Sequence, residues 1–194
     1  HENTYYPGEI NLRAADLLIV NKVKQAKRKD LKEVLQNVKK YNKAGKNAEI
    51  ILADSAVSVD RPELIKNKKV IVVEDGPTLT HGGMSFGAGI VAAKRFGAKP
   101  VNCRPWARGT VRKTFKKYRH LGNVIPAMGY SAEQIKELEQ TINKTPADVV
   151  LCATPINLKR ILKLNKPIVR VHYDLKEIGE RKKLEKFLVR KLHL

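Results

Sequence analysis

The feature that most constrains this chain is an apolar, β-branched run at residues 70–73 that stops at two carboxylates. Glu74 and Asp75 follow the run, and a loop rich in Gly, Thr and His leads on to Gly89. A buried strand that delivers acids and small residues to its carboxyl end, ahead of a helix, is where open α/β sheets place their ligands. The alternative is a tight β-to-α turn without a ligand, in which one acid only caps the next element.

Similar alternations recur along the chain and predict the fold class. Apolar runs predict strands at 16–23, 49–53, 69–73, 100–103, 148–153 and 167–173. Helical spacing of apolar residues predicts helices at 29–41, 131–145, 158–164 and 178–192. Strands that alternate with helices indicate βαβ units. We therefore expect an α/β fold with a mostly parallel sheet and flanking helices, a three-layer arrangement of the P-loop NTPase or Rossmann type.

The organisation of the 194 residues suggests a piece of a larger protein. The chain begins at His1 rather than Met, and a soft boundary lies near residues 57–62. We expect residues 1–60 to be the end of a P-loop NTPase-like core and residues 61–194 to be a C-terminal α/β part that carries the loop after Asp75. The sequence holds no GxxxxGK[ST] motif, so a P-loop would have to precede His1.

Charge and cysteine usage narrow the function classes. A formal net charge of +20 indicates an anionic partner, namely nucleic acid, an acidic membrane surface or a highly charged small substrate, or else a lysine-rich solvated surface. Cys103 and Cys152 form no CxxC pair, which argues against structural zinc and is typical of a reduced cytoplasmic compartment. No run is long and apolar enough to span a bilayer, so we expect a cytoplasmic protein and no membrane partner.

The loop after residue 73 supplies most of the candidate site residues. Asp75 and Glu74 are candidate Mg²⁺ ligands, because Mg²⁺ prefers one or two carboxylates plus phosphate oxygens. Asp75 is favoured, since strand alternation turns one of the two acids back into the sheet. His81 would donate to a phosphoryl oxygen or move a proton. Hydroxyl and backbone N–H groups provide further candidates for binding phosphate: Thr78, Thr80, Gly82 and Gly83.

A second candidate is Asn21-Lys22, which follows the strand expected at 16–23. This is the position of the guanine-reading Asn-Lys-x-Asp box of P-loop GTPases, but Lys24 stands where the box has Asp. A cation cannot accept the hydrogen bonds from the guanine edge, so guanine selectivity should be lost. Asn21 and Lys22 would then flank an adenine, or form a strand end with solvated lysines.

The basic segment at 104–120 has three interpretations. Arg104 and Arg108 around a proline turn would clamp phosphate or carboxylate groups. The lysines and arginines that follow, interleaved with aromatic residues, also resemble a nucleic-acid-binding stripe. Alternatively, Val111, Phe115 and Tyr118 form the core face of a helix whose cations are simply solvated.

Two motifs carry a resemblance to a known family. The segments VEDGPTLTHGGM at 73–84 and PAMGYS at 126–131, with further similarity over nearly the whole chain, resemble the C-terminal part of the cyclic 2,3-diphosphoglycerate synthetase family. Its relatives are often described as predicted P-loop GTPases. The resemblance implies an ATP-dependent ligase that joins the two phosphates of 2,3-diphosphoglycerate into an intramolecular phosphoanhydride, with ADP and phosphate as by-products.

This hypothesis gives each candidate residue a role. Asp75, with Mg²⁺, His81 and Arg104 would be catalytic, Arg108 would help to hold a small polyanionic substrate, and ATP would be the nucleotide. The alternatives are a nucleotide hydrolase, a ligase for another phosphorylated metabolite, or an inert basic module that binds RNA or a ribosome, for which the basic run at 181–191 is a candidate. A homodimer is compatible with all of these.

Overall fold

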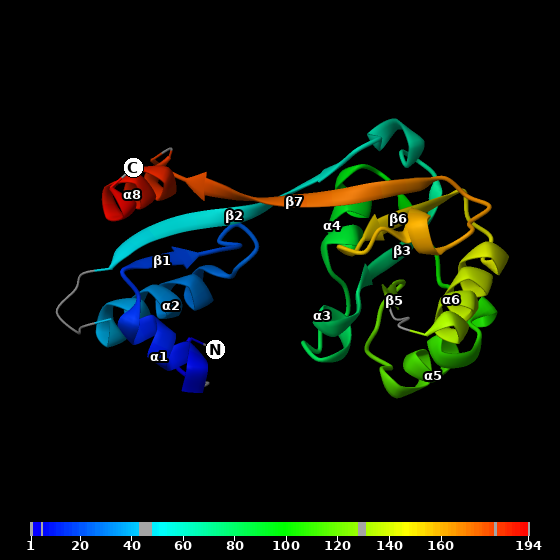
Figure 1. Ribbon diagram of the computed structural model, residues 1–194, viewed down its shortest axis with the longest axis horizontal. Coiled ribbons are helices and arrows are strands. Elements are labelled where there is room, and N and C mark those ends of the chain that lie inside the picture. The colour runs from blue at the N-terminus through cyan, green and yellow to red at the C-terminus, as the bar shows by residue number, and fades with distance from the viewer. Residues whose placement is uncertain (1, 5, 43–47, 128–130, 181, 194) are drawn as a thin grey trace. The chain divides into compact units, whose positions relative to one another are not determined.

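The computed structural model describes residues 2–4, 6–42, 48–127, 131–180 and 182–193. It divides the chain into two compact units (Figure 1). Unit 1 combines residues 1–56 with residues 174–194, and unit 2 is the continuous segment 57–173. The sequence placed a soft boundary close to Val57, but nothing in it indicated that the end of the chain groups with its beginning.

Unit 1 is a small α/β layer structure. Its elements are α1 (Tyr6–Ala14), β1 (Leu17–Val20), α2 (Arg28–Tyr41), most of β2 (Glu49–Val59), the end of β7 (Ile168–Ile178) and α8 (Lys183–Leu192). Strand β1 pairs in parallel with β2, with Leu17 opposite Glu49. The residues of this unit that are most deeply buried come from the helices and from alternate positions of β2: Leu12, Val38, Ile51 and Ala53.

Unit 2 is built around strand β3. Its elements in chain order are η1 (Pro62–Leu64), β3 (Lys69–Asp75), α3 (Gly76–Thr80), α4 (Ala88–Arg95), β4 (Lys99–Pro100), η2 (Arg104–Trp106), α5 (Gly109–Lys117), β5 (Ile125–Ala127), α6 (Ala132–Lys144), β6 (Val149–Ala153) and α7 (Leu158–Ile161). Strand β3 pairs in parallel with β6 on one side, and with β4 and then β5 on the other. Strand β6 in turn pairs in parallel with β7.

The strand order confirms the expected fold class. Neighbouring strands run β1-β2-β7-β6-β3-β4, with β5 also on β3. The pairs β1–β2, β3–β4, β3–β5, β3–β6 and β6–β7 are all parallel, and β7 beside β2 is the one antiparallel pair among the described strands. Helices flank the sheet, as expected for βαβ units. The chain is therefore an α/β protein with a mostly parallel sheet.

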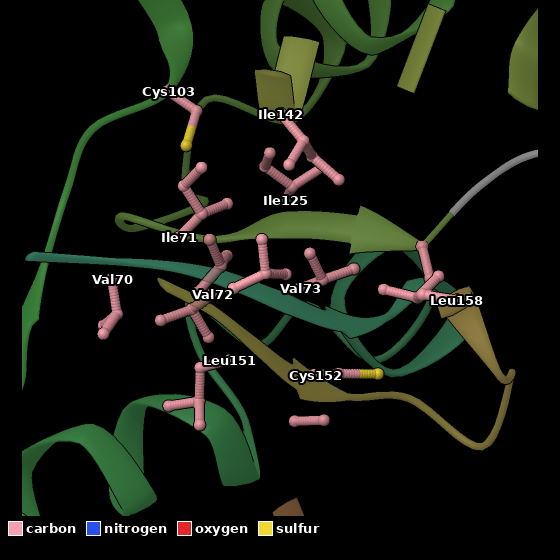
Figure 2. Close-up of a cluster of buried hydrophobic side chains, with 14 of the residues drawn as sticks. Val70, Ile71, Val72, Val73, Cys103, Ile125, Ile142, Leu151, Cys152 and Leu158 are labelled. Atoms are coloured by element: carbon pink, nitrogen blue, oxygen red, sulfur yellow. The ribbon is translucent and has the colours of Figure 1, made fainter. Parts of the chain in front are cut away.

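The main hydrophobic core lies in unit 2, on both faces of β3. Residues 70–73 and all of β6 are buried, as the continuous apolar runs predict for central parallel strands. Figure 2 shows Ile71 with Ile142 and Cys103 on one side of the strand and Leu151 on the other. Helix α4 packs closely on the second side, because a Cβ built on Gly89 would lie 2.5 Å from Val72 Cγ1. This two-sided core fixes the carboxyl end of β3.

Several expected elements differ in extent. The strand expected at 100–103 is only Lys99–Pro100, and the helix expected from residue 178 begins at Lys183 because β7 continues to Ile178. Helix α1 and strand β5 had no counterpart in the prediction. Helix α5 corresponds to the third interpretation of the basic segment, a helix with Val111 and Phe115 on its core face. Within the described part of the chain, no helix is long and apolar enough to cross a membrane.

Candidate active site at the carboxyl edge of unit 2

The topology of unit 2 creates a switch point. After β3 the chain builds β4 and β5 on one side of that strand, and the connection through α6 then returns it to the other side as β6. The carboxyl ends of β3 and β6 are neighbours, with Glu74 opposite Ala153. The loops that leave two such strands diverge, and ligands of open α/β sheets bind in the resulting crevice. The EDGPTLTHGG segment therefore starts at the position that the sequence predicted.

Asp75 begins helix α3. It is the N-cap residue, and its Oδ2 accepts hydrogen bonds from the Thr78 hydroxyl at 2.9 Å and from the Thr78 backbone N–H at 3.4 Å. The side chain is partly exposed at the sheet edge. Both bonds go to one oxygen, so Oδ1 is left free to contact a ligand. The prediction that Asp75 is the outward-facing acid agrees with this geometry.

The Glu74 side chain points to the other face of the sheet, where it accepts hydrogen bonds from the N-terminus of helix α4. Its side chain is 2% exposed, and Oε1 accepts from the backbone N–H groups of Gly87 at 3.0 Å and Ile90 at 3.1 Å. Burial raises the pKa of Glu74, while hydrogen bonds from the backbone N–H groups of Gly89, Ile90 and Gly87 act in the opposite direction. The Glu74 carboxylate is thus buried and hydrogen-bonded to the N-terminus of α4. This placement does not favour its expected role as an Mg²⁺ ligand.

Glycine is required where this carboxylate meets the backbone. A Cβ on Gly87 would lie 2.5 Å from Glu74 Oε2. In the loop itself, a Cβ on Gly82 would lie 2.5 Å from the Thr78 carbonyl oxygen, and Gly83 has a φ of +65°. Side chains at these positions would force the loop to move. The glycines therefore set the path of the loop, whether or not their N–H groups also contact an anion.

The loop between α3 and α4 is exposed and carries several of the expected phosphate-binding groups. His81 to Phe86 are all exposed. The Thr80 hydroxyl donates to the Gly76 carbonyl at 2.9 Å and lies 3.0 Å from His81 Nδ1. The Thr80 hydroxyl is therefore already hydrogen-bonded within α3. Because it also lies beside Nδ1, it helps to orient the His81 imidazole at the sheet edge.

Thr154 provides the β6 side of the same edge. It directly follows Ala153, is 4% exposed, and its hydroxyl accepts from the Ile156 backbone N–H at 3.3 Å. On the β5 side of this edge, the described residues stop at Ala127 and resume at Ser131. Gly129 of the PAMGYS motif therefore lies outside them.

Arg104 supports the loop from a distance. Its guanidinium donates to the carbonyl oxygens of Leu121 and Gly122 and lies over the Phe115 ring, 4.8 Å from the centroid. The Gly122 backbone N–H in turn donates to the Ser85 carbonyl at 2.8 Å. These contacts describe a residue that fixes the segment against which the loop rests, a role that the sequence did not suggest. His120 adds a second tie, with Nε2 3.1 Å from the Leu79 carbonyl oxygen.

The remaining predicted residues lie elsewhere. Arg108 is exposed just before α5, and its backbone N–H donates to the Thr141 hydroxyl. Asn21 and Lys22 belong to unit 1. There the Asn21 side chain donates to the Ser55 hydroxyl at 3.0 Å and accepts from the Lys22 backbone N–H, and Lys22 has a φ of 59°. Asn21 thus connects the carboxyl end of β1 to the middle of β2.

The acids and cysteines do not form a ready-made metal centre. Among the described residues there is no group of three or more His, Cys, Asp or Glu side chains that could hold a metal ion. Both cysteines are buried, and burial raises the pKa of Cys103 to about 11. Mg²⁺ commonly combines one or two protein carboxylates with phosphate oxygens, and Asp75 is the partly exposed carboxylate at this edge.

Comparison with known proteins gives one informative match. Over 183 residues the chain is 56% identical to the protein named arginine synthetase ArcE from Thermococcus kodakarensis. The match covers 94% of this chain but 40% of that relative, so the chain spans less than half the length of the curated relative that it matches. No family model and no solved structure matches the chain.

Proposed function

We propose that this chain is the part of an ATP-dependent ligase that carries an acceptor-activating phosphoryl-transfer site. The observation that carries the proposal is the 56% identity, over 94% of the chain, to a protein named as a synthetase. The switch-point edge of unit 2 supports it, because a capped acid, an exposed glycine loop and an imidazole lie together there. Phosphoryl transfer needs positioning and charge neutralisation more than a covalent nucleophile.

The name of the relative suggests the acceptor. An ATP-dependent enzyme that forms arginine has to convert a ureido oxygen into a leaving group. Transfer of the γ-phosphoryl group of ATP to that oxygen releases ADP, and attack of ammonia on the ureido carbon then expels phosphate and forms the new C–N bond. We therefore propose a ureido amino acid as acceptor and arginine as product.

A second candidate keeps the same first step. The VEDGPTLTHGGM and PAMGYS motifs resemble the cyclic 2,3-diphosphoglycerate synthetase family. In that reaction ATP phosphorylates one phosphate of the substrate, and the neighbouring phosphate displaces the new group intramolecularly. The two candidates differ in the acceptor and not in the chemistry demanded of the site, so one set of residues is proposed for both.

In this proposal each residue has a role at the sheet edge. Asp75 holds Mg²⁺ through Oδ1, and the metal ion neutralises the phosphate charge. His81 donates to a phosphoryl oxygen, and the backbone N–H of Gly83 binds the transferred phosphate. The backbone N–H of Gly82 already donates to the Pro77 carbonyl at 3.2 Å, so Gly82 shapes the loop instead. Thr78, which already donates to Asp75 Oδ2, keeps that carboxylate in place. Arg104 acts through the segment at 121–122 as a positioning residue.

The test is an acceptor comparison with the full-length protein. It is incubated with Mg-ATP and either citrulline plus ammonium or 2,3-diphosphoglycerate, and ATP consumption is followed by phosphorus NMR and product by amino-acid analysis. The proposal predicts acceptor-dependent formation of ADP and phosphate, with arginine in the first reaction; a new phosphoanhydride signal in the second would select the second candidate. ATP hydrolysis at the same rate without any acceptor would contradict a ligase.

A further inference from the structure

Helix α5 has a fixed apolar face and a strongly basic outer face. Val111, Thr114 and Phe115 are buried, so the inner face is anchored in the core of unit 2. Residues 104–119 contain seven Lys and Arg residues and no Asp or Glu. The exposed cations therefore project from a rigid support rather than from a mobile segment.

Only part of this charge is neutralised locally. Glu137 accepts from the Thr110 hydroxyl at 2.6 Å and from the Thr110 backbone N–H at 2.7 Å. These bonds lower the pKa of Glu137, and the positive charge of Lys113 lowers it further, so Lys113 has an acidic neighbour. The other exposed cations of the helix and its end form the α5 basic face: Arg112, Lys116, Lys117 and Arg119.

The members of the α5 basic face have no acidic partners. Among the ion pairs that the described residues form, none includes any of these four cations. Arg112 Nε donates to the Ala107 carbonyl at 3.0 Å, and Lys117 Nζ lies 5.3 Å from the centre of the Tyr118 ring. Like charges one turn apart destabilise a helix. An anionic partner would offset this repulsion.

Helix α8 provides the contrast. From the sequence, its basic run was a candidate for binding RNA. In the structure, most of these cations form ion pairs: Lys186 with Glu180 at 2.7 Å, Lys182 with Glu185 at 3.1 Å and Lys191 with Asp16 at 3.3 Å. Arg190 pairs with Glu49. Charge that is neutralised in this way contributes little to binding an external polyanion. The four cations of the α5 basic face have no such acidic partners among the described residues.

The form of the α5 basic face selects the class of partner. Arg112 and Lys116 lie one helical turn apart, Lys117 is the last residue of α5 and Arg119 follows the helix. The cations are therefore spread along α5 and its end, which does not suit a small polyanion. No large apolar side chain of the described residues is exposed between residues 104 and 120, whereas a protein interface is organised around an apolar centre. We propose that the α5 basic face binds the phosphate backbone of RNA, without base-specific contacts.

The experiment measures binding of the full-length protein to a fluorescein-labelled 20-nucleotide oligouridylate by fluorescence anisotropy from 50 to 300 mM KCl. The variant Lys116→Gln/Lys117→Gln/Arg119→Gln should bind at least about tenfold more weakly at 100 mM KCl. Its slope of log affinity against log salt should be smaller by about 2, since each lost phosphate contact on a single strand contributes about 0.7. The variant Lys116→Arg/Lys117→Arg keeps the charge and should bind as the wild type does.

The matched control is Lys182→Gln/Lys186→Gln on α8, whose cations are paired with acids. It should leave both the affinity and the salt slope unchanged, and thermal melting confirms that all variants are folded. An unchanged affinity of the triple variant would overturn the proposal, as would an equal loss in the α8 control, which would indicate diffuse attraction by net charge. Competition by polyglutamate that is as strong as competition by unlabelled RNA would assign the face to an acidic polypeptide.

Discussion

Glu74 and Asp75 are adjacent in sequence but start two different helices. Successive side chains of a strand point to opposite faces, so Asp75 caps α3 at the exposed edge while Glu74 turns inward to the start of α4. The two acids thereby hold both ends of the glycine loop. Helix α3 follows Asp75 directly, and α4 begins beyond the loop at Ala88.

The buried acid has a predictable effect on the pH dependence of stability. Because burial raises the pKa of Glu74 in the folded protein, the folded state binds a proton more tightly than the unfolded state does. Stability from this group is full below the ordinary pKa of Glu and is lost as pH rises through the raised pKa. The advantage of wild type over Glu74→Gln in melting temperature should therefore shrink between pH 4 and 8. An advantage that grows with pH would contradict this.

Asp75 allows its structural and proposed chemical roles to be separated. Asn is as good an N-cap residue as Asp, whereas Ala at an N-cap costs about 0.5–2 kcal/mol. We expect Asp75→Asn to keep the melting temperature within a degree or two, and to reduce acceptor-dependent ATP turnover by about 10²-fold or more, because the metal-binding charge is gone. Asp75→Ala should lose both. Turnover by Asp75→Asn close to that of wild type would remove Asp75 from the metal site.

At the scale of elements, the contact between α4 and the sheet depends on Gly89. Helix propensity alone predicts that Gly89→Ala stabilises the protein by about 1 kcal/mol. The structure predicts the opposite sign, a loss of about 1–3 kcal/mol through overpacking, because the new Cβ would lie 2.5 Å from Val72 Cγ1 and 3.0 Å from Ala153 Cβ. Denaturant unfolding measures this change.

A double-mutant cycle identifies the cause. In a Val72→Ala background the nearest atom is gone, so Gly89→Ala should cost clearly less than it does in the wild type. Equal costs in the two backgrounds would show that α4 is not limited by its contact with Val72.

An element or a contact could be predicted from the sequence where a local residue pattern determines it, and could not where tertiary contacts determine it. The central strands β3 and β6 were predictable because they are apolar throughout and buried on both faces, and α6 was predictable because its apolar residues recur at helical spacing. The three-residue strand β5 was not, since it is too short for any periodicity and contains Pro126. The outward position of Asp75 followed from alternation, whereas the ties of Arg104 to Leu121 and Gly122 depend on tertiary contacts that no local pattern encodes.

For the whole molecule, the division into units predicts that unit 2 is independent. All buried residues of the main core cluster fall between Val57 and Val171, and unit 2 is a continuous segment of chain. A fragment of residues 57–173 should therefore unfold in one cooperative transition in urea. The same experiment on residues 1–56 alone should show none, because this unit also includes residues 174–194. A fragment of unit 2 without a cooperative transition would contradict the division.

The measurement that tests the central claim most directly follows one oxygen atom. The full-length protein is incubated with Mg-ATP, ammonium and citrulline labelled with ¹⁸O at the ureido oxygen, and the phosphate released is examined by phosphorus NMR. Activation by phosphoryl transfer predicts that the label appears in inorganic phosphate, in step with arginine formation. Arginine formed with unlabelled phosphate would contradict the account, because the acceptor oxygen would then have left without being bonded to the transferred γ-phosphoryl group.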